Sequence, residues 1–121
     1  MSTSKNQSFV ARLRFACAGF AHGLRVERSV QIQSVALVLV VIVMSVLRVE
    51  PEWWALVFVA SALVIAAEML NTAIEHLADH LHPEIHPAIR IVKDCAAAGV
   101  LAASAGALGV AVALASHLLG R

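Results

Sequence analysis

Residues 68–79 read EMLNTAIEHLAD and follow without a break from an apolar run that a membrane would accept. On a helix that turns by about 100° per residue, four polar side chains of this stretch fall within an arc of roughly 80°: Glu68, Asn71, Glu75 and Asp79. Carboxylates are costly in hydrocarbon unless they face a partner, an ion or water. The stretch therefore predicts a membrane-spanning helix with a functional site on one face.

The composition is that of an integral membrane protein. Of the 121 residues, 60% are hydrophobic and only 14% are charged, whereas soluble domains are usually about 45–50% apolar. We therefore expect an all-α integral membrane protein with a single domain over residues 1–121. The basic N-terminal end has few aromatic side chains that would stack on bases, so nucleic acid is not an expected partner.

The apolar pattern predicts one surface helix and three membrane spans. At about residues 9–28, apolar side chains recur at helical spacing among arginines, which is typical of an amphipathic helix lying at the membrane surface. The spans are expected at about residues 30–47, 53–79 and 94–119. Pro51 and its charged neighbours end the first span, and Trp53 and Trp54 open the second at the headgroup boundary.

The last span is rich in small residues at three-to-four spacing, including Gly99, Gly106 and Gly109. Such residues allow transmembrane helices to approach closely. We expect tight helix packing there, which includes packing between subunits; a helix that faces lipid is the alternative.

Basic residues indicate the orientation of the chain. Five of the nine Lys and Arg precede the first span, and Arg90 and Lys93 follow the second, whereas Arg48 and Arg121 fall on the opposite side. By the positive-inside rule, the N-terminus is expected in the cytoplasm and the C-terminus outside.

This orientation divides the polar stripe by depth. Glu68 lies about 22 Å inward from Trp53 at about 1.5 Å per residue, just inside the cytoplasmic boundary of a hydrocarbon core about 30 Å thick. Glu75 and Asp79 then emerge into the cytoplasm. Glu68 is suited to accept a proton from a lipid hydroxyl, and Glu75 and Asp79 are oxygen ligands of the kind that Mg²⁺ prefers. Glu27 offers a further carboxylate at the same depth.

Lys93 and Asp94 are expected at the N-terminal end of the third span. A lysine there can meet a phosphate group, helped by the positive end of the helix dipole. The alternative is an interfacial lysine beside a capping aspartate. For Glu68 and Asn71 the alternative is hydrogen bonding between helices, as in a structural or adaptor membrane protein.

Four histidines follow or lie within the polar stripe: His76, His80, His82 and His86. They leave open a transition-metal site. A small oligomeric ion or metal transporter that uses the intramembrane carboxylates is accordingly the alternative to an enzyme.

The chain resembles the prokaryotic diacylglycerol kinase family, which also includes undecaprenol kinases. The residues that carry the resemblance form the patterns ExxNTAIExxxD at 68–79 and KDxxAxxVL at 93–101, with Phe15, Gly19 and Glu27 nearer the N-terminus. The chain contains no P-loop motif.

The resemblance implies a three-span homotrimer in the bacterial inner membrane, with a surface helix and a composite active site between subunits at the cytoplasmic face. It implies a lipid kinase that transfers the γ-phosphate of ATP, with Mg²⁺, to a lipid alcohol. Glu68 matches the general base, and Glu27 and Glu75 match the carboxylates that hold the metal. Further positions around the nucleotide and the transferred phosphate are Gly19, Asn71, Asp79, Lys93 and Asp94.

The lipid substrate stays open between diacylglycerol and undecaprenol. The pair His86–Pro87 and the pair Glu27–Arg28 are similar to undecaprenol kinases of Gram-positive bacteria. Gln31 and Gln33, however, replace a basic residue and a histidine that this branch usually carries.

Overall fold

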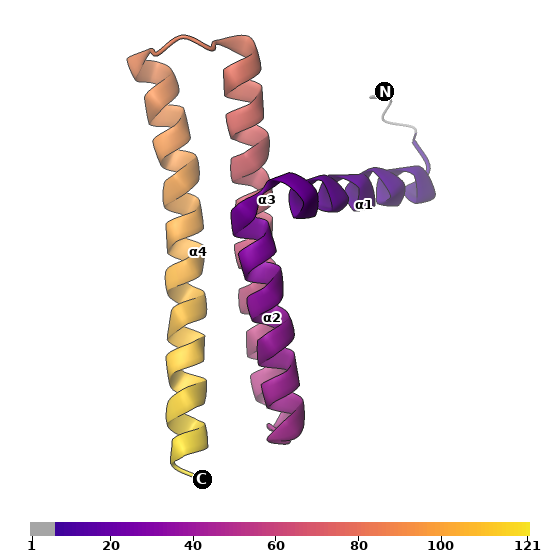
Figure 1. Cartoon of the computed structure of the whole chain (residues 1–121), viewed down its shortest axis with the longest axis vertical. Coiled ribbons are helices and arrows are strands. Elements are labelled where there is room, and N and C mark those ends of the chain that lie inside the picture. Colours follow the sequence, from indigo (N-terminus) through magenta and orange to yellow (C-terminus); the bar gives the residue numbers. More distant parts are fainter. Residues whose placement is uncertain (1–6) are drawn as a thin grey trace.

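The computed structural model describes residues 7–121, and within that range the chain is all-helical (Figure 1). Its four helices are α1 (Phe9–Val26), α2 (Arg28–Val46), α3 (Pro51–Leu81) and α4 (Pro87–Leu119). This confirms the predicted class. Lys5, which contributes to the N-terminal charge, lies outside the described residues.

Helices α2, α3 and α4 are each long and apolar enough to cross a membrane. At about 1.5 Å per residue, the 19 residues of α2 match a hydrocarbon core about 30 Å thick, whereas the 31 residues of α3 and the 33 of α4 exceed it. Helix α1 lies across the long axis of the bundle, and the upper parts of α3 and α4 extend beyond it (Figure 1). The α3–α4 hairpin therefore projects past the end of α2.

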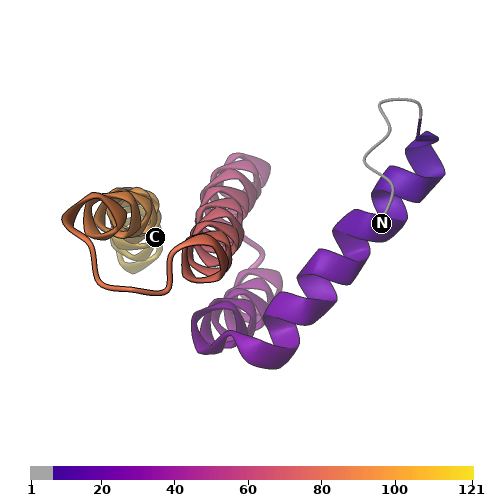
Figure 2. The same ribbon diagram turned by 90° about the horizontal axis from the view of Figure 1, so that it is seen from above.

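Helix α3 is central to the arrangement. It packs most extensively on α4 and also contacts α2 and α1. Seen from above, α2 and α4 lie on different sides of α3, and α1 leads away from the bundle (Figure 2). Residues that face both neighbours therefore come mainly from α3, the helix that carries the polar stripe.

Two prolines begin helices rather than interrupt them. Pro51 is the first residue of α3 and Pro87 the first residue of α4, a position where the missing amide proton costs nothing because it has no helical partner. The His86 side chain caps α4 by accepting a hydrogen bond from the amide of Ala88 at 3.1 Å. Because α4 begins at Pro87 and not near Asp94, Lys93 and Asp94 lie in its second turn, and the helix-dipole argument for Lys93 does not apply.

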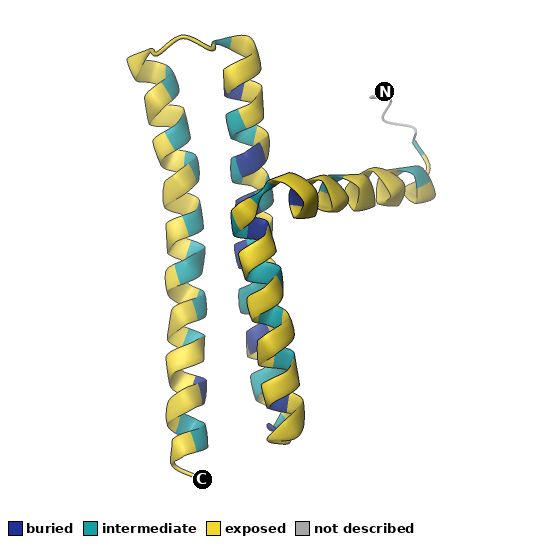
Figure 3. Cartoon of the chain, in the orientation of Figure 1, coloured by how far each residue is buried: buried dark blue, intermediate teal, exposed yellow. Residues whose placement is uncertain are grey.

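Little of the described chain is buried, and half of the buried residues lie on α3 (Figure 3). A hydrophobic cluster of Met44, Val49, Val57 and Leu114 closes the end of the bundle away from α1, and Trp53 and Trp54 pack against it. Large apolar side chains are exposed along all four helices. This pattern fits helices whose outer faces meet lipid or another subunit.

The glycines of α4 do not mediate close packing within the chain. A Cβ atom added at Gly99, Gly106 or Gly109 would meet nothing within 4 Å. These positions are therefore open to close approach only from outside the described chain.

Candidate functional site

Glu68 is the buried carboxylate of the structure, with 6% of its surface exposed. Its Oε2 atom accepts a hydrogen bond of 2.9 Å from the hydroxyl of Ser29 on α2. Oε1 has no hydrogen-bond partner among residues 7–121. The carboxylate is thus held on one oxygen and free on the other.

The junction between α1 and α2 lies against α3 at this level. Glu27 caps the end of α1 and the start of α2 with an extended backbone. Its Oε1 lies 3.7 Å from Nε2 of His76, whose ring meets the ring of His22 edge to face at 5.7 Å. The Gln31 side chain stabilises the corner by donating a 2.9 Å hydrogen bond to the carbonyl of Leu24. Glu27 is therefore brought next to the carboxylate stripe.

Gly23 determines how closely α1 approaches α3. It is the buried residue of α1, and a Cβ atom there would lie 2.9 Å from Sδ of Met69 and 3.3 Å from its methyl group. The sequence interpretation missed Gly23, because a glycine in an amphipathic helix shows its importance only when the facing side chain is known.

Asn71 and Glu75 lie on the same helix without side-chain partners in the described chain. The Oδ1 atom of Asn71 is buried and accepts no hydrogen bond. Glu75 is half-buried and forms no ion pair or side-chain hydrogen bond with residues 7–121. Buried polar atoms are rarely left unpaired, so the Asn71 carbonyl indicates a donor outside the described residues.

Asp79 and Lys93 form a second group on the projecting hairpin. The ammonium of Lys93 on α4 contacts Oδ1 of Asp79 on α3. Asp94 is exposed and has no such partner in the described part of the chain, and a Cβ atom at Gly19 would meet nothing within 4 Å. One chain thus assembles three pairs, Glu68 with Ser29, Glu27 with His76 and Asp79 with Lys93, and leaves Asp94 and Gly19 apart.

No group of three or more His, Cys, Asp or Glu side chains within residues 7–121 is arranged to hold a metal ion. The loop histidines pack instead, with the rings of His82 and His86 at 5.5 Å. Magnesium bound with a nucleotide differs, because it commonly takes only one or two protein carboxylates and completes its shell with phosphate and water. Glu27 and Glu75 offer oxygen donors of that kind.

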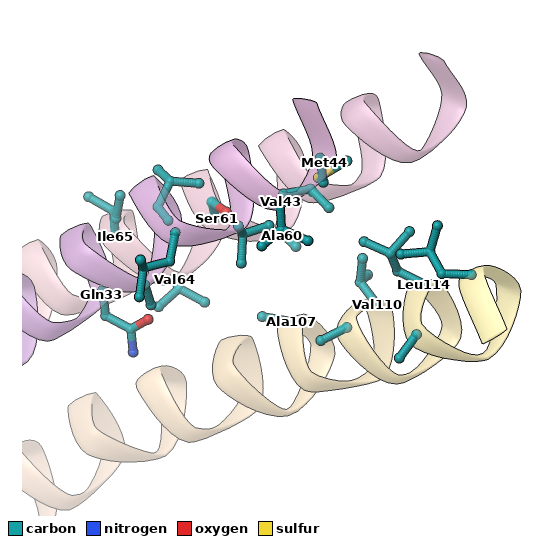
Figure 4. A pocket seen from close by; sticks show the side chains of 18 residues that line it. Gln33, Val43, Met44, Ala60, Ser61, Val64, Ile65, Ala107, Val110 and Leu114 are labelled. Carbon is teal, nitrogen blue, oxygen red and sulfur yellow. The ribbon is translucent and has the colours of Figure 1, made fainter. Parts of the chain in front are cut away.

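An apolar groove of about 390 Å³ lies between α2, α3 and α4 (Figure 4). Its walls are mostly aliphatic, and Gln33 and Ser61 are its polar members. Gln33 lies one helical turn from Ser29, and Val64 lies one turn from Glu68. The groove therefore begins just beneath the hydrogen bond between Ser29 and Glu68 and runs away from the hairpin.

Residues 14–115 match the model of a protein family described as prokaryotic diacylglycerol kinase. The chain belongs to this family. The match contains both groups just described and every position that the sequence predicted for the site, from Gly19 to Asp94. The resemblance stated from the two motifs is thereby confirmed.

Two curated relatives agree with the family. The chain is 32% identical over 102 residues to a diacylglycerol kinase of Synechocystis sp., a match that covers 84% of this chain and 58% of the relative. It is 33% identical over 76 residues to an undecaprenol kinase of Bacillus subtilis, covering 63% of this chain and 62% of the relative. The chain thus spans about three fifths of the length of these diacylglycerol kinase family members.

Proposed function

We propose that this chain is a lipid kinase that transfers the γ-phosphate of ATP to the hydroxyl of a membrane lipid at the cytoplasmic face of a bacterial inner membrane. The observation that carries the proposal is the buried carboxylate of Glu68, fixed through one oxygen and free on the other, in a member of the diacylglycerol kinase family. Membership of a kinase family favours this activity over the ion or metal transporter.

Glu68 acts as the general base in this proposal. The proton of the lipid hydroxyl passes to Oε1 of Glu68, the hydroxyl oxygen forms a bond to the γ-phosphorus, and the bond between that phosphorus and the β–γ bridging oxygen breaks to release ADP. Phosphoryl transfer depends mainly on positioning and on neutralising charge. A base that is packed between α2 and α3 meets the first requirement, since its side chain has little freedom to move.

The nucleotide would bind on the side of the hairpin. Glu27 and Glu75 would hold Mg²⁺, which when bound would neutralise phosphate charge. The unpaired Oδ1 of Asn71 and the cation of Lys93 would serve the nucleotide and the transferred phosphate. Further nucleotide contacts are proposed for Gly19, Asp79 and Asp94.

We further propose a homotrimer with the site completed between subunits. Three features support an assembly: the polar residues of one chain fall into separate groups, the Asn71 carbonyl lacks a donor in the described chain, and the glycines of α4 are open to close approach from outside. A neighbouring copy of the chain would bring the separate polar groups together, donate to the Asn71 carbonyl and pack against the glycines.

The apolar groove suits the hydrocarbon part of the substrate. Its position one turn beneath Glu68 would align a chain in the groove with a hydroxyl at the carboxylate, in the manner of an apolar pocket with a few polar groups at one end. A glyceride and a long isoprenoid alcohol both have this form, so both remain candidates.

The test is phosphorylation of a panel of lipid alcohols by the purified full chain with radiolabelled ATP. The panel contains diacylglycerol, undecaprenol and a soluble short alcohol. We expect label in one of the two lipids and none in the soluble alcohol. No labelled lipid, with uptake of metal into vesicles that contain the protein, would contradict the proposal and favour the transporter.

A further inference from the structure

The three serines of α2 use their hydroxyl groups in two different ways. Ser34 and Ser45 each donate to the carbonyl four residues earlier in their own helix, at 2.8 Å and 2.7 Å. This is the usual arrangement for serine within a helix, particularly where no water competes. Ser29 differs, because its hydroxyl reaches across to Glu68 on α3.

The position of Ser29 explains the difference. It is the second residue of α2, so the carbonyl four residues before it belongs to Arg25 of α1. That carbonyl lies at the corner between the helices and is approached at 3.4 Å by Nε2 of Gln31. The Ser29 hydroxyl is therefore turned toward α3, where it meets the carboxylate.

The bond has a definite direction and leaves a definite atom free. An ionised carboxylate only accepts hydrogen bonds, so the hydroxyl must donate. A hydrogen bond to a charged group is stronger than one between neutral groups. It occupies Oε2 and selects one rotation of the carboxylate, while Oε1 stays without a partner in the described chain.

We propose that Ser29 is the positioning residue of the general base: its hydroxyl fixes Glu68 through Oε2 so that Oε1 receives the proton of the lipid hydroxyl. This rests on the proposed kinase function. Ser29 acts through Glu68 and does not itself contact the reacting atoms. Loss of the hydroxyl lowers the rate of the chemical step and leaves the binding of ATP and lipid nearly unchanged, because neither substrate depends on Ser29 for its contacts.

The experiment compares Ser29→Thr with Ser29→Val, two side chains of the same shape that differ in the hydroxyl. The full chain is assayed in phospholipid micelles with a lipid alcohol that the unaltered protein phosphorylates. Ser29→Val is expected to lower kcat by about tenfold or more, with KM for lipid and ATP within about twofold, and Ser29→Thr is expected to stay within about threefold of the unaltered protein. Ser34→Ala removes a hydroxyl that bonds only its own helix, and it should retain full activity.

A second comparison covers the case in which Ser29→Val does not fold. Ser29→Ala is combined with Glu68→Asp, which shortens the base by one methylene and withdraws it from Ser29. If Ser29 acts through Glu68, the loss of the hydroxyl should cost less than about twofold in this background, because coupled residues are not additive. Equal kcat for Ser29→Thr and Ser29→Val, or a full tenfold loss in the Glu68→Asp background, would overturn the role of Ser29 while the kinase activity stands. An unaltered protein that labels no lipid would instead refute the function on which this role rests.

Discussion

Gly23 of α1 faces Met69 of α3 so closely that a methyl group in place of its hydrogen would lie 2.9 Å from the sulfur. Met69 is next to Glu68 in the sequence, so this contact sets how near α1 comes to the proposed base. A methionine side chain is flexible at its far end and can move aside for one methyl group. It has less room to move aside for a branched side chain.

We therefore expect Gly23→Ala to be tolerated and Gly23→Val to lower kcat by about tenfold, because a displaced α1 disturbs the junction that carries Glu27 and Ser29. The measurement is the phosphorylation rate of the purified variants. Ala21→Val places the same side chain on an exposed position of α1 and should have little effect. Equal activity of all three variants would show that the spacing between α1 and α3 is unimportant.

Glu68→Gln removes the proposed base and keeps the shape of the side chain. The amide oxygen can still accept from Ser29, so the protein should remain folded and inserted. We expect kcat to fall by about 100-fold or more, the usual effect of losing a general base. Glu84→Gln makes the same change in the exposed α3–α4 loop and should leave the rate unaltered. Turnover like that of the unaltered protein would exclude Glu68 as the base.

Glu75→Gln tests the metal side of the site. Since Glu75 has no cationic partner in the described chain, its removal leaves no ion pair broken there. We expect the Mg²⁺ concentration for half-maximal rate to rise roughly tenfold or more, with the maximal rate partly restored at high Mg²⁺. The measurement is a Mg²⁺ titration of the kinase rate at fixed ATP. An unchanged titration would remove Glu75 from the metal site.

The opposite end of the bundle contains a pH-dependent contact. Oε2 of Glu50 lies 2.9 Å from Nε2 of His117, and the Glu50 backbone amide followed by the His117 side chain lowers the pKa of Glu50. A carboxyl whose pKa is lower in the folded state stabilises the fold above its ordinary pKa of about 4.5 and loses this effect as the pH falls through the folded-state value.

Glu50→Gln should therefore lower the melting temperature modestly at neutral pH, and the difference should shrink as the pH falls below about 4.5 and through the lowered folded-state pKa of Glu50. Thermal unfolding in detergent at several pH values measures this. Glu52→Gln removes a neighbouring exposed charge that has no ion pair in the described chain, and it should shift the melting temperature less. A difference between the Glu50 variant and the unaltered protein that does not shrink at any pH below 4.5 would contradict the assignment.

The sequence predicted the helices better than their beginnings. Apolar periodicity and length predicted one amphipathic helix and three long apolar ones, because both follow from the local chain, and the structure has four helices of which three are long and apolar. The start of α4 was placed near Asp94, and α4 begins at Pro87. Proline stops a helix that precedes it and suits the first turn of one that follows, and the sequence interpretation considered only the first effect.

The sequence also predicts that the polar residues of α3 share one face, because they lie on one helix and their relative angles are fixed. The sequence does not predict which residues of other helices face this stripe. Ser29 and Gly23 face α3 only because of how α1 and α2 rotate and slide against it, and packing decides that rotation. The sequence alone does not distinguish Ser29 from the other serines of α2, or Gly23 from the other glycine of α1.

Helix α2 is joined to the crosswise α1 through Glu27 alone, and its 19 residues have a length close to one hydrocarbon thickness. The distance between α1 and the far end of the bundle is therefore fixed by the length of α2. In a thicker or thinner bilayer the chain must tilt, or the lipid must stretch or compress around it. Ser29 lies at the corner, so such an adjustment acts directly on the contact with Glu68. The rate of the proposed kinase reaction should accordingly depend on the acyl-chain length of the membrane around the protein.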